Sequence, residues 1–231
     1  MNELGVASAR PGSPLARLVL RRAEPADVDA IFALKQCLQI TPVAGATTRG
    51  GFLLGVSRAR YAELVAHANV LVLESGRVLH GFAVTLPDRV LRASALWARR
   101  DAIAWAAGVP AIADEIPIGY FDQIACAPGW ASRLGAPALA LRALLDLLAA
   151  GHRHVFATVV REPVHNLAAL RMLEAIGARH VGQLRESHDA LPELRSDVYH
   201  LDCSGTSHET PWEDTALGRR IVRTIAQLSA S

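Results

Sequence analysis

The chain has 231 residues, 51% of them hydrophobic and 20% charged, with a formal net charge of +2. This balance is typical of a globular protein and gives no indication of nucleic acid or a membrane surface as a partner. Three widely spaced cysteines lack the CxxC pattern of a zinc site, so we expect no metal and no disulfide framework. No apolar run approaches the roughly 18 residues of a membrane span. We therefore expect a cytoplasmic protein.

The N-terminal half predicts strands and helices in mixed order. Residues 1–14 are rich in Gly, Ser and Pro and are expected to form a flexible leader. The apolar run 15–23 predicts a strand, and a helix follows, with Pro25 suited to its first turn. The other predicted elements are a loop over 41–51, a helix over 57–68, and strands over 69–74 and 77–86 around a tight turn.

Residues 88–116 predict an insertion between strands. Trp97 and Trp105 lie in an Ala- and Arg-rich helical pattern, and eight residues apart they fall roughly on one helical face. Two interpretations stay open. The two tryptophans line an acceptor pocket, or they pack against the rest of the domain.

The C-terminal half predicts a central unit of strand, loop, helix, strand and helix. Residues 118–127 predict a strand that ends at Pro128-Gly129. A loop over 128–136 and a helix over 137–150 follow, and the first helical position suits Pro137; the stretch ASRLGAPAL (131–139) spans the change from loop to helix. A strand over 154–160 precedes a second helix over 166–177, which Asn166 caps. The remaining predicted elements are strands over 178–186 and 193–203 and an amphipathic helix over 212–228 within a C-terminal extension, 204–231. This mixed order predicts an α/β sheet with some antiparallel pairs.

The segment 118–182 resembles the GCN5-related N-acetyltransferase (GNAT) superfamily, and the resemblance extends over about 15–203. It rests on the strand IGYFDQIACAP, on Ala136 at the end of the following loop, and on Asn166 and Gly177 at the two ends of the second helix. The sequence departs from the motif at Leu134, where glycine is usual, and at Ala178, where an aromatic residue is usual.

The resemblance implies a fold, a cofactor and a site. The fold is a mixed, mostly antiparallel sheet of about seven strands, with helices on both faces and a splayed central strand pair. The cofactor is acetyl-CoA, whose pantetheine arm lies along the first of the splayed strands. The residues implied in cofactor binding are Ile124, Ala125 and Cys126 on that strand, Arg133, Leu134, Gly135 and Ala136 at the pyrophosphate, and Asn166 at the pantetheine.

The implied reaction is direct acyl transfer from the thioester to an amine, which needs a base within hydrogen-bond reach. Asp122 is the first candidate, Glu115 the second and Tyr120 the third. Asp122 alternates with Gln123, so one of the two is expected to face the cleft. Some family members use a tyrosine acid seven residues after the asparagine, and here that position is Leu173.

The sequence thus predicts an N-acetyltransferase that acts on a small-molecule or protein amine. The alternative is a GNAT-fold module that binds acyl-CoA, or regulates, without turnover. In simpler interpretations, Asp122 is a polar residue on a solvated sheet face, Cys126 is a small core residue, and His152 belongs to a solvated turn. The C-terminal helix carries an apolar stripe and suggests a homodimer.

Overall fold

A computed structural model describes residues 18–106, 117–188 and 191–203, with the backbone alone for residues 130–134 and 192. The predicted leader, Glu115 and the predicted C-terminal helix lie outside these ranges. Within the described parts of the chain, no helix combines the length and apolar character that crossing a membrane requires. The same residues include no group of three His, Cys, Asp or Glu side chains that could hold a metal ion.

The N-terminal half forms the elements that its patterns predict, with one difference: a short strand, Gly45–Thr47, lies within the predicted loop 41–51, because it pairs with Val164–Asn166 far along the chain. In chain order they are β1 (Val19–Arg22), a short 3-10 helix (Pro25–Asp27), α1 (Val28–Cys37), β2 (Gly45–Thr47), α2 (Arg58–His67), β3 (Asn69–Ser75) and β4 (Val78–Leu86). The tight turn between the last two strands has positive φ at Gly76 and Arg77, as a two-residue hairpin requires.

The second half is again mixed. Its elements are α3 (Asp88–Arg92), α4 (Ala95–Ala98), a 3-10 helix (Arg100–Ala102), β5 (Ile103–Trp105), β6 (Ile118–Cys126), α5 (Trp130–Ala149), β7 (His154–Glu162), β8 (Val164–Asn166), α6 (Leu167–Ala175), β9 (Arg179–His188) and β10 (Leu191–Asp202).

The main sheet has the strand order β1-β3-β4-β6-β7-β10-β9-β5, and only the β6–β7 pair is parallel. The predicted mixed, mostly antiparallel sheet is therefore confirmed, with eight strands in place of about seven. The additional strand is β5, which lies within the predicted insertion 88–116 and pairs with β9 at the edge of the sheet. A separate two-stranded parallel sheet joins β2 to β8.

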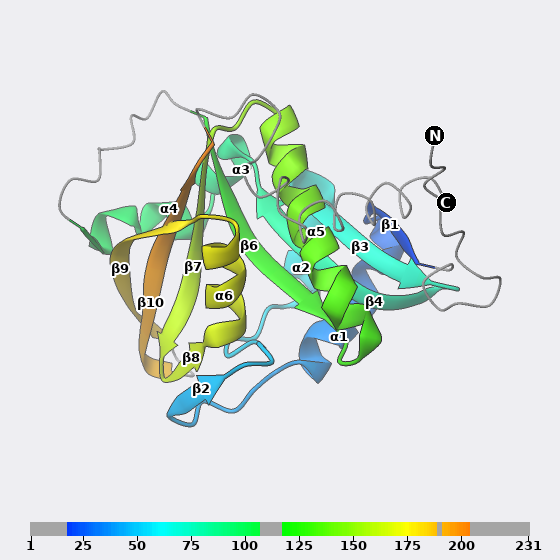
Figure 1. Cartoon of the computed structure of the whole chain (residues 1–231), viewed down its shortest axis with the longest axis horizontal. Coiled ribbons are helices and arrows are strands. Elements are labelled where there is room, and N and C mark those ends of the chain that lie inside the picture. Colours follow the sequence, from blue (N-terminus) through cyan, green and yellow to red (C-terminus); the bar gives the residue numbers. More distant parts are fainter. Residues whose placement is uncertain (1–17, 107–116, 189–190, 204–231) are drawn as a thin grey trace, which may run out of the picture.

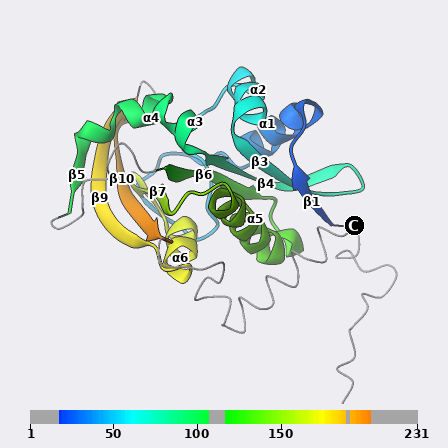
Figure 2. The same cartoon turned by 90° about the horizontal axis from the view of Figure 1, so that it is seen from above.

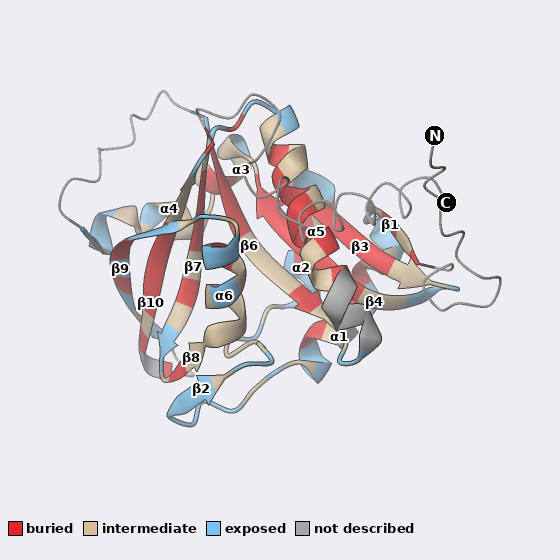
Figure 3. Ribbon diagram, viewed as in Figure 1, coloured by how far each residue is buried: buried red, intermediate tan, exposed pale blue. Residues whose placement is uncertain are grey.

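Helices cover both faces of the sheet, as predicted. In Figure 2 α1 and α2 lie on one side of the strands, and α5 and α6 lie on the other. Two hydrophobic cores fill the spaces between the helices and the sheet, one on each face. Burial is accordingly concentrated on the central strands (Figure 3).

The central strands β6 and β7 pair over only part of their length. Ile118–Phe121 pair with His154–Ala157, and the pairing then stops. Beyond that point β6 stays paired with β4, and β7 stays paired with β10, so the two strands diverge (Figure 1). The predicted splayed strand pair is confirmed, and the point of divergence lies between Phe121 and Asp122.

Two local predictions are wrong. Helix α5 begins at Trp130, seven residues before Pro137, which lies inside the helix. The residues of α5 pack in the hydrophobic core, and this packing offsets the cost of a proline inside the helix. Trp97 and Trp105 do not share a helix, because the chain turns after α4 and Trp105 belongs to the edge strand β5.

His152 is a structural residue and not part of a solvated turn. Its side chain is buried, its Nδ1 lies 3.0 Å from the carbonyl oxygen of Leu147, and its Nε2 accepts the backbone N–H of Asp88 at 3.0 Å. The Asp88 carboxylate in turn accepts the N–H of Ile118. The imidazole thus joins the end of α5 to α3 and, through Asp88, to the start of β6.

Candidate functional site

The opening between β6 and β7 exposes backbone hydrogen-bonding groups of β6. Ala127 donates its N–H to the carbonyl of His80 on β4 at 2.7 Å, which sets the alternation along this ladder. Ala125 therefore directs its N–H and C=O at β4, whereas Ile124 and Cys126 direct theirs at the opening. Of the three strand residues predicted to bind pantetheine, Ile124 and Cys126 have the backbone orientation that an added extended chain needs.

The start of α5 lies directly after this strand. Gly129 turns the chain with φ of 119° and the helix follows at Trp130. The amides without a partner inside a helix belong to its first turn, which here contains Trp130, Ala131 and Ser132. The amides of Arg133 to Ala136 fall in the following turn, where they bond to carbonyls four residues back. The side chains of Arg133 and Leu134 lie outside the described parts.

Gly135 serves packing. A Cβ atom at this position would lie 2.3 Å from Cδ2 of Leu73 on β3. Leu73 is fully buried, so the glycine lets α5 lie close against the sheet. The single glycine of the ASRLGAPAL segment is thus explained by contact between helix and strand.

A β-bulge places Asp122 at the point of divergence. On β4, Val84 pairs with Gln123 and Thr85 pairs with Phe121, which leaves Asp122 without a partner. In a bulge the two adjacent residues no longer point to opposite faces. The Asp122 Oδ2 accepts a hydrogen bond from Nε2 of Gln123 at 3.1 Å. The expectation that the two side chains face opposite ways is therefore wrong.

Asp122 has an unusual environment for a carboxylate. Burial raises its pKa above the ordinary value of 3.8, and the hydrogen bond from Gln123 and the positive charges of Arg60 and Lys35 oppose this rise. Its Oδ1 has no hydrogen bond to any residue in the described ranges, and the side chain is only partly buried. One carboxylate oxygen is held, and the other is available to accept a proton.

Lys35 on α1 lies near this carboxylate. It is 5% exposed, donates from Nζ to the carbonyl of Leu54 at 2.7 Å, and lies 4.7 Å from the centre of the Phe52 ring. Burial lowers its pKa to about 8, and the charge of Asp122 opposes that shift. Lys35 is the only lysine in the sequence.

The other two candidates for the base differ from Asp122. Glu115 lies outside the described residues. The Tyr120 side chain is buried, its hydroxyl lies 2.6 Å from Oγ1 of Thr158, and burial raises its pKa further above the neutral range. A phenol that holds its proton so firmly is a poor base.

Asn166 caps α6, since its Oδ1 accepts the N–H of Ala169 at 3.1 Å. The side-chain amide nitrogen is not used by this cap. The residue before the helix also belongs to β8, which pairs with β2 from the connection between α1 and α2. Asn166 thus lies where the connection between β7 and α6 meets the connection between α1 and α2, with Thr47 as its partner in the short sheet.

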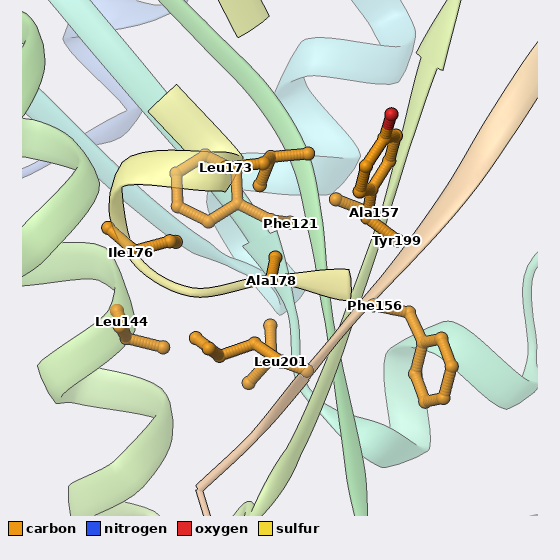
Figure 4. Close-up of a pocket in the computed structure, with 10 residues that line it drawn as sticks. Phe121, Leu144, Phe156, Ala157, Leu173, Ile176, Ala178, Tyr199 and Leu201 are labelled. Atoms are coloured by element: carbon orange, nitrogen blue, oxygen red, sulfur yellow. The ribbon is translucent and has the colours of Figure 1, made fainter. Parts of the chain in front are cut away.

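Ala178, one of the two departures from the acetyltransferase motif, lines an apolar pocket together with Leu173, the position where some family members use a tyrosine acid. Leu173 and Ala178 face it together with Phe121 of β6 and Tyr199 of β10 (Figure 4). Leu173 is buried in the core, and its hydrocarbon side chain cannot act as an acid. Cys126 belongs to the same packed region, and burial raises the pKa of its thiol to about 12, which suits a core residue better than a nucleophile.

The two tryptophans predicted to bind an acceptor are not brought together by one element. Trp97 is half-buried, with the guanidinium groups of Arg92 and Arg100 at 4.7 and 4.9 Å from its ring. Trp105 is 44% exposed and meets the edge of Phe156. Trp97 packs in the hydrophobic core on the α1–α2 face.

Sequence reasoning missed two residues that lie near Asp122, Tyr61 and Lys35. Tyr61 on α2 is fully buried and donates its hydroxyl to Oε1 of Gln123 at 2.7 Å. Thr158, which was also missed, contacts the hydroxyl of Tyr120 and not Asp122. Tyr61 carries a weak signal in the sequence, because a tyrosine on the apolar face of a helix brings a hydroxyl that needs a buried partner.

Comparisons with known proteins place this arrangement. No family model matches the chain, and no curated protein matches it. Solved structures do. An N-acetyltransferase from Staphylococcus aureus Mu50 is 18% identical, with a TM-score of 0.53 over 80% of this chain and 98% of that one. The ribosomal-protein-S18-alanine N-acetyltransferase from Escherichia coli is 15% identical, with a TM-score of 0.54 over 83% and 97%.

A third similar structure is a putative acetyltransferase from Salmonella typhimurium with its cofactor acetyl-CoA. It is 16% identical, with a TM-score of 0.53 over 83% of this chain and 96% of that one. Another is described as a putative acetyltransferase of the GNAT family. The chain therefore has the GNAT fold, as its motifs predicted.

Proposed function

We propose that the protein is an acetyl-CoA-dependent N-acetyltransferase that works by direct transfer in a ternary complex. The observation that carries this proposal is the partly buried carboxylate of Asp122, held at the point where β6 and β7 diverge. A base, an open strand edge and a helix start lie in consecutive segments of one chain. The GNAT fold of the chain supports the same function.

The residues present fit acetyl-CoA. The opening-facing backbone groups of Ile124 and Cys126 would hold the pantetheine arm as an added strand. Asn166, at the start of α6 after β7, is the proposed further contact to the pantetheine. The amides of Trp130 to Ser132 would bind the pyrophosphate, which moves that site toward the N-terminus from the predicted Arg133 to Ala136. When bound, acetyl-CoA supplies a thioester that is reactive toward amines.

The chain's own part in the reaction centres on one proton. An amine is a nucleophile only after it loses its proton, and Oδ1 of Asp122 can accept that proton directly or through a water molecule. Burial raises the pKa of Asp122 and so makes it a stronger base. Leu173 supplies no proton to the leaving group, so the chain has no acid at that position.

The acceptor is proposed to be a small-molecule amine or a protein amine. The second candidate function is an acyl-CoA-binding or regulatory module without turnover, which Leu173 favours because it removes a common acid. We also propose a cytoplasmic location, since the three cysteines are free thiols. A homodimer through residues 212–228 is a separate proposal, tested by sedimentation of the full chain.

Calorimetry and thiol release test the function. Acetyl-CoA titrated into the full chain should bind with a stoichiometry near one, and an amine panel should produce amine-dependent release of the CoA thiol. Asp122→Asn should keep binding and lower the release rate by about 100-fold or more. Asp197→Asn is the matched control, because Asp197 is a buried carboxylate on β10. Binding without release over the whole panel would favour the module, and no binding at millimolar acetyl-CoA would exclude both.

A further inference from the structure

We propose that Tyr61 is a positioning residue for the proposed reaction, and that it orients the Asp122 carboxylate through the side-chain amide of Gln123. The inference rests on the proposed function, in which Asp122 is the base. It assigns a role to a residue of α2 that lies 61 positions before Asp122 in the chain and is linked to it by hydrogen bonds only through Gln123. Two hydrogen bonds carry it, at 2.7 and 3.1 Å.

Tyr61 is held in place by packing. Its side chain is fully buried, and its ring meets the edge of the Phe82 ring, with the ring centres 5.8 Å apart and the planes at 83°. Phe82 in turn stacks on Phe52. The ring is thus buried against Phe82 on β4, and its hydroxyl lies beside Gln123.

The Tyr61 hydroxyl influences which end of the Gln123 side-chain amide faces Asp122. A glutamine amide has a donating end and an accepting end, and it can turn over to exchange them. Burial raises the pKa of Tyr61, so its hydroxyl keeps its proton and acts as a donor. It therefore holds Oε1 of Gln123, and this leaves Nε2 directed at Asp122. The hydroxyl and the carboxylate fix the amide together, because the O–H selects Oε1 and the carboxylate selects Nε2; loss of the hydroxyl removes one of these two restraints.

The Gln123 amide in turn affects Asp122. A hydrogen bond donated to a carboxylate stabilises its charged form and lowers its pKa, against the rise that burial causes. The bond occupies Oδ2 and leaves Oδ1 for the proton. The bulge makes this possible, since in a regular strand Gln123 and Asp122 would face opposite ways.

The other titratable groups near Asp122 are not altered by a change at Tyr61. They are Lys35 from α1, Arg60 from α2, and Tyr120 from β6 itself. Arg60 is bonded to Glu63, and Lys35 to Leu54, so each has an anchor apart from Tyr61. A change in the titration of Asp122 on loss of the Tyr61 hydroxyl therefore reports on the amide.

Tyr61→Phe tests the proposal, with Gln123→Met as the second variant and Tyr199→Phe as the control. Tyr199 is a buried tyrosine in the core on the opposite face of the sheet. The acid limb of kcat/KM for the amine should move to higher pH by about half to one unit in the first two variants and stay in place in the third. The KM for acetyl-CoA should be unchanged in all three.

A second readout separates this inference from the proposed function. The Asp122 carboxyl carbon, followed by NMR titration in the free protein, should show the same upward shift in Tyr61→Phe and Gln123→Met whether or not the protein turns over. An unchanged titration in both folded variants would overturn the role of Tyr61. A shifted titration in a protein that releases no thiol would leave this hydrogen-bond chain standing and reject the enzyme.

Discussion

The hydroxyl of Tyr120 on β6 lies 2.6 Å from Oγ1 of Thr158 on β7. Tyr120 belongs to the last paired stretch of the two strands, and Thr158 is the first residue of β7 beyond it. The bond therefore joins the strands at the point where they separate, and it belongs to the architecture of the opening.

Tyr120→Phe separates the two described candidates for the base. Loss of the hydroxyl should reduce the free energy of unfolding by about 1 kcal/mol, because one buried hydrogen bond is lost. Amine-dependent thiol release should stay within about tenfold of the wild type, since the Asp122 carboxylate remains. Chemical denaturation and the release assay measure the two effects. A loss of release as large as that in Asp122→Asn would make Tyr120 the base instead.

His152→Ala should destabilise the fold by about 1–3 kcal/mol, because the backbone N–H of Asp88 loses its acceptor in a buried place. His67→Ala is the control, since His67 is an exposed histidine at the end of α2. Urea denaturation of both variants measures the difference. Equal stability of the two variants would show that the link between α5 and α3 contributes nothing.

Lys35 should give the stability a dependence on alkaline pH. Its pKa is lowered by burial to about 8, from an ordinary value of 10.5. Between these values Lys35 holds a proton in the unfolded chain that it has released in the folded chain, so Lys35 contributes a rise in the free energy of unfolding with pH. The buried thiols of Cys126 and Cys203, whose pKa values are raised, contribute a fall over the same range. Lys35→Met should lose this rise. Because the chain has no other lysine, the difference between the two curves isolates one group; parallel curves would contradict the burial of its charge.

Gly135→Ala tests whether this glycine serves packing. The added methyl group meets Leu73 in the core, so the variant should lose about 1–3 kcal/mol of stability although alanine favours a helix. Gly55→Ala is matched to it, because a Cβ atom at Gly55 meets nothing within 4 Å. Thermal denaturation compares the two variants. Greater stability of Gly135→Ala would show that Leu73 moves aside freely.

The larger elements follow from short-range patterns in the sequence. Apolar periodicity and turn residues predicted β3, β4, β6 and β7 and the helices α1, α2 and α6, and Asn166 was correctly predicted as a cap. These features depend on neighbours along the chain. The splayed strand pair was predicted from the resemblance to a family and not from apolar periodicity.

The errors arise where distant contacts decide the structure. Pro137 favours a helix start, yet α5 extends back to Trp130 because its packing against β3, β4 and β6 outweighs the local preference. The bulge at Asp122 depends on how β6 pairs with β4. The prediction that strand residues alternate between faces therefore gave the wrong direction for its side chain. Tyr61 and Gln123 are far apart in the chain, and only the packing of α2 on the sheet brings their side chains together.

The most direct test of the site is amide hydrogen exchange of the full chain with and without acetyl-CoA. The amides of Ile124 and Cys126, together with those of Trp130 to Ser132, should exchange more slowly at saturating acetyl-CoA. The amide of Ala125, already directed at β4, should change little. Unchanged exchange at Ile124 and Cys126 with acetyl-CoA bound would contradict the placement of the cofactor between β6 and β7.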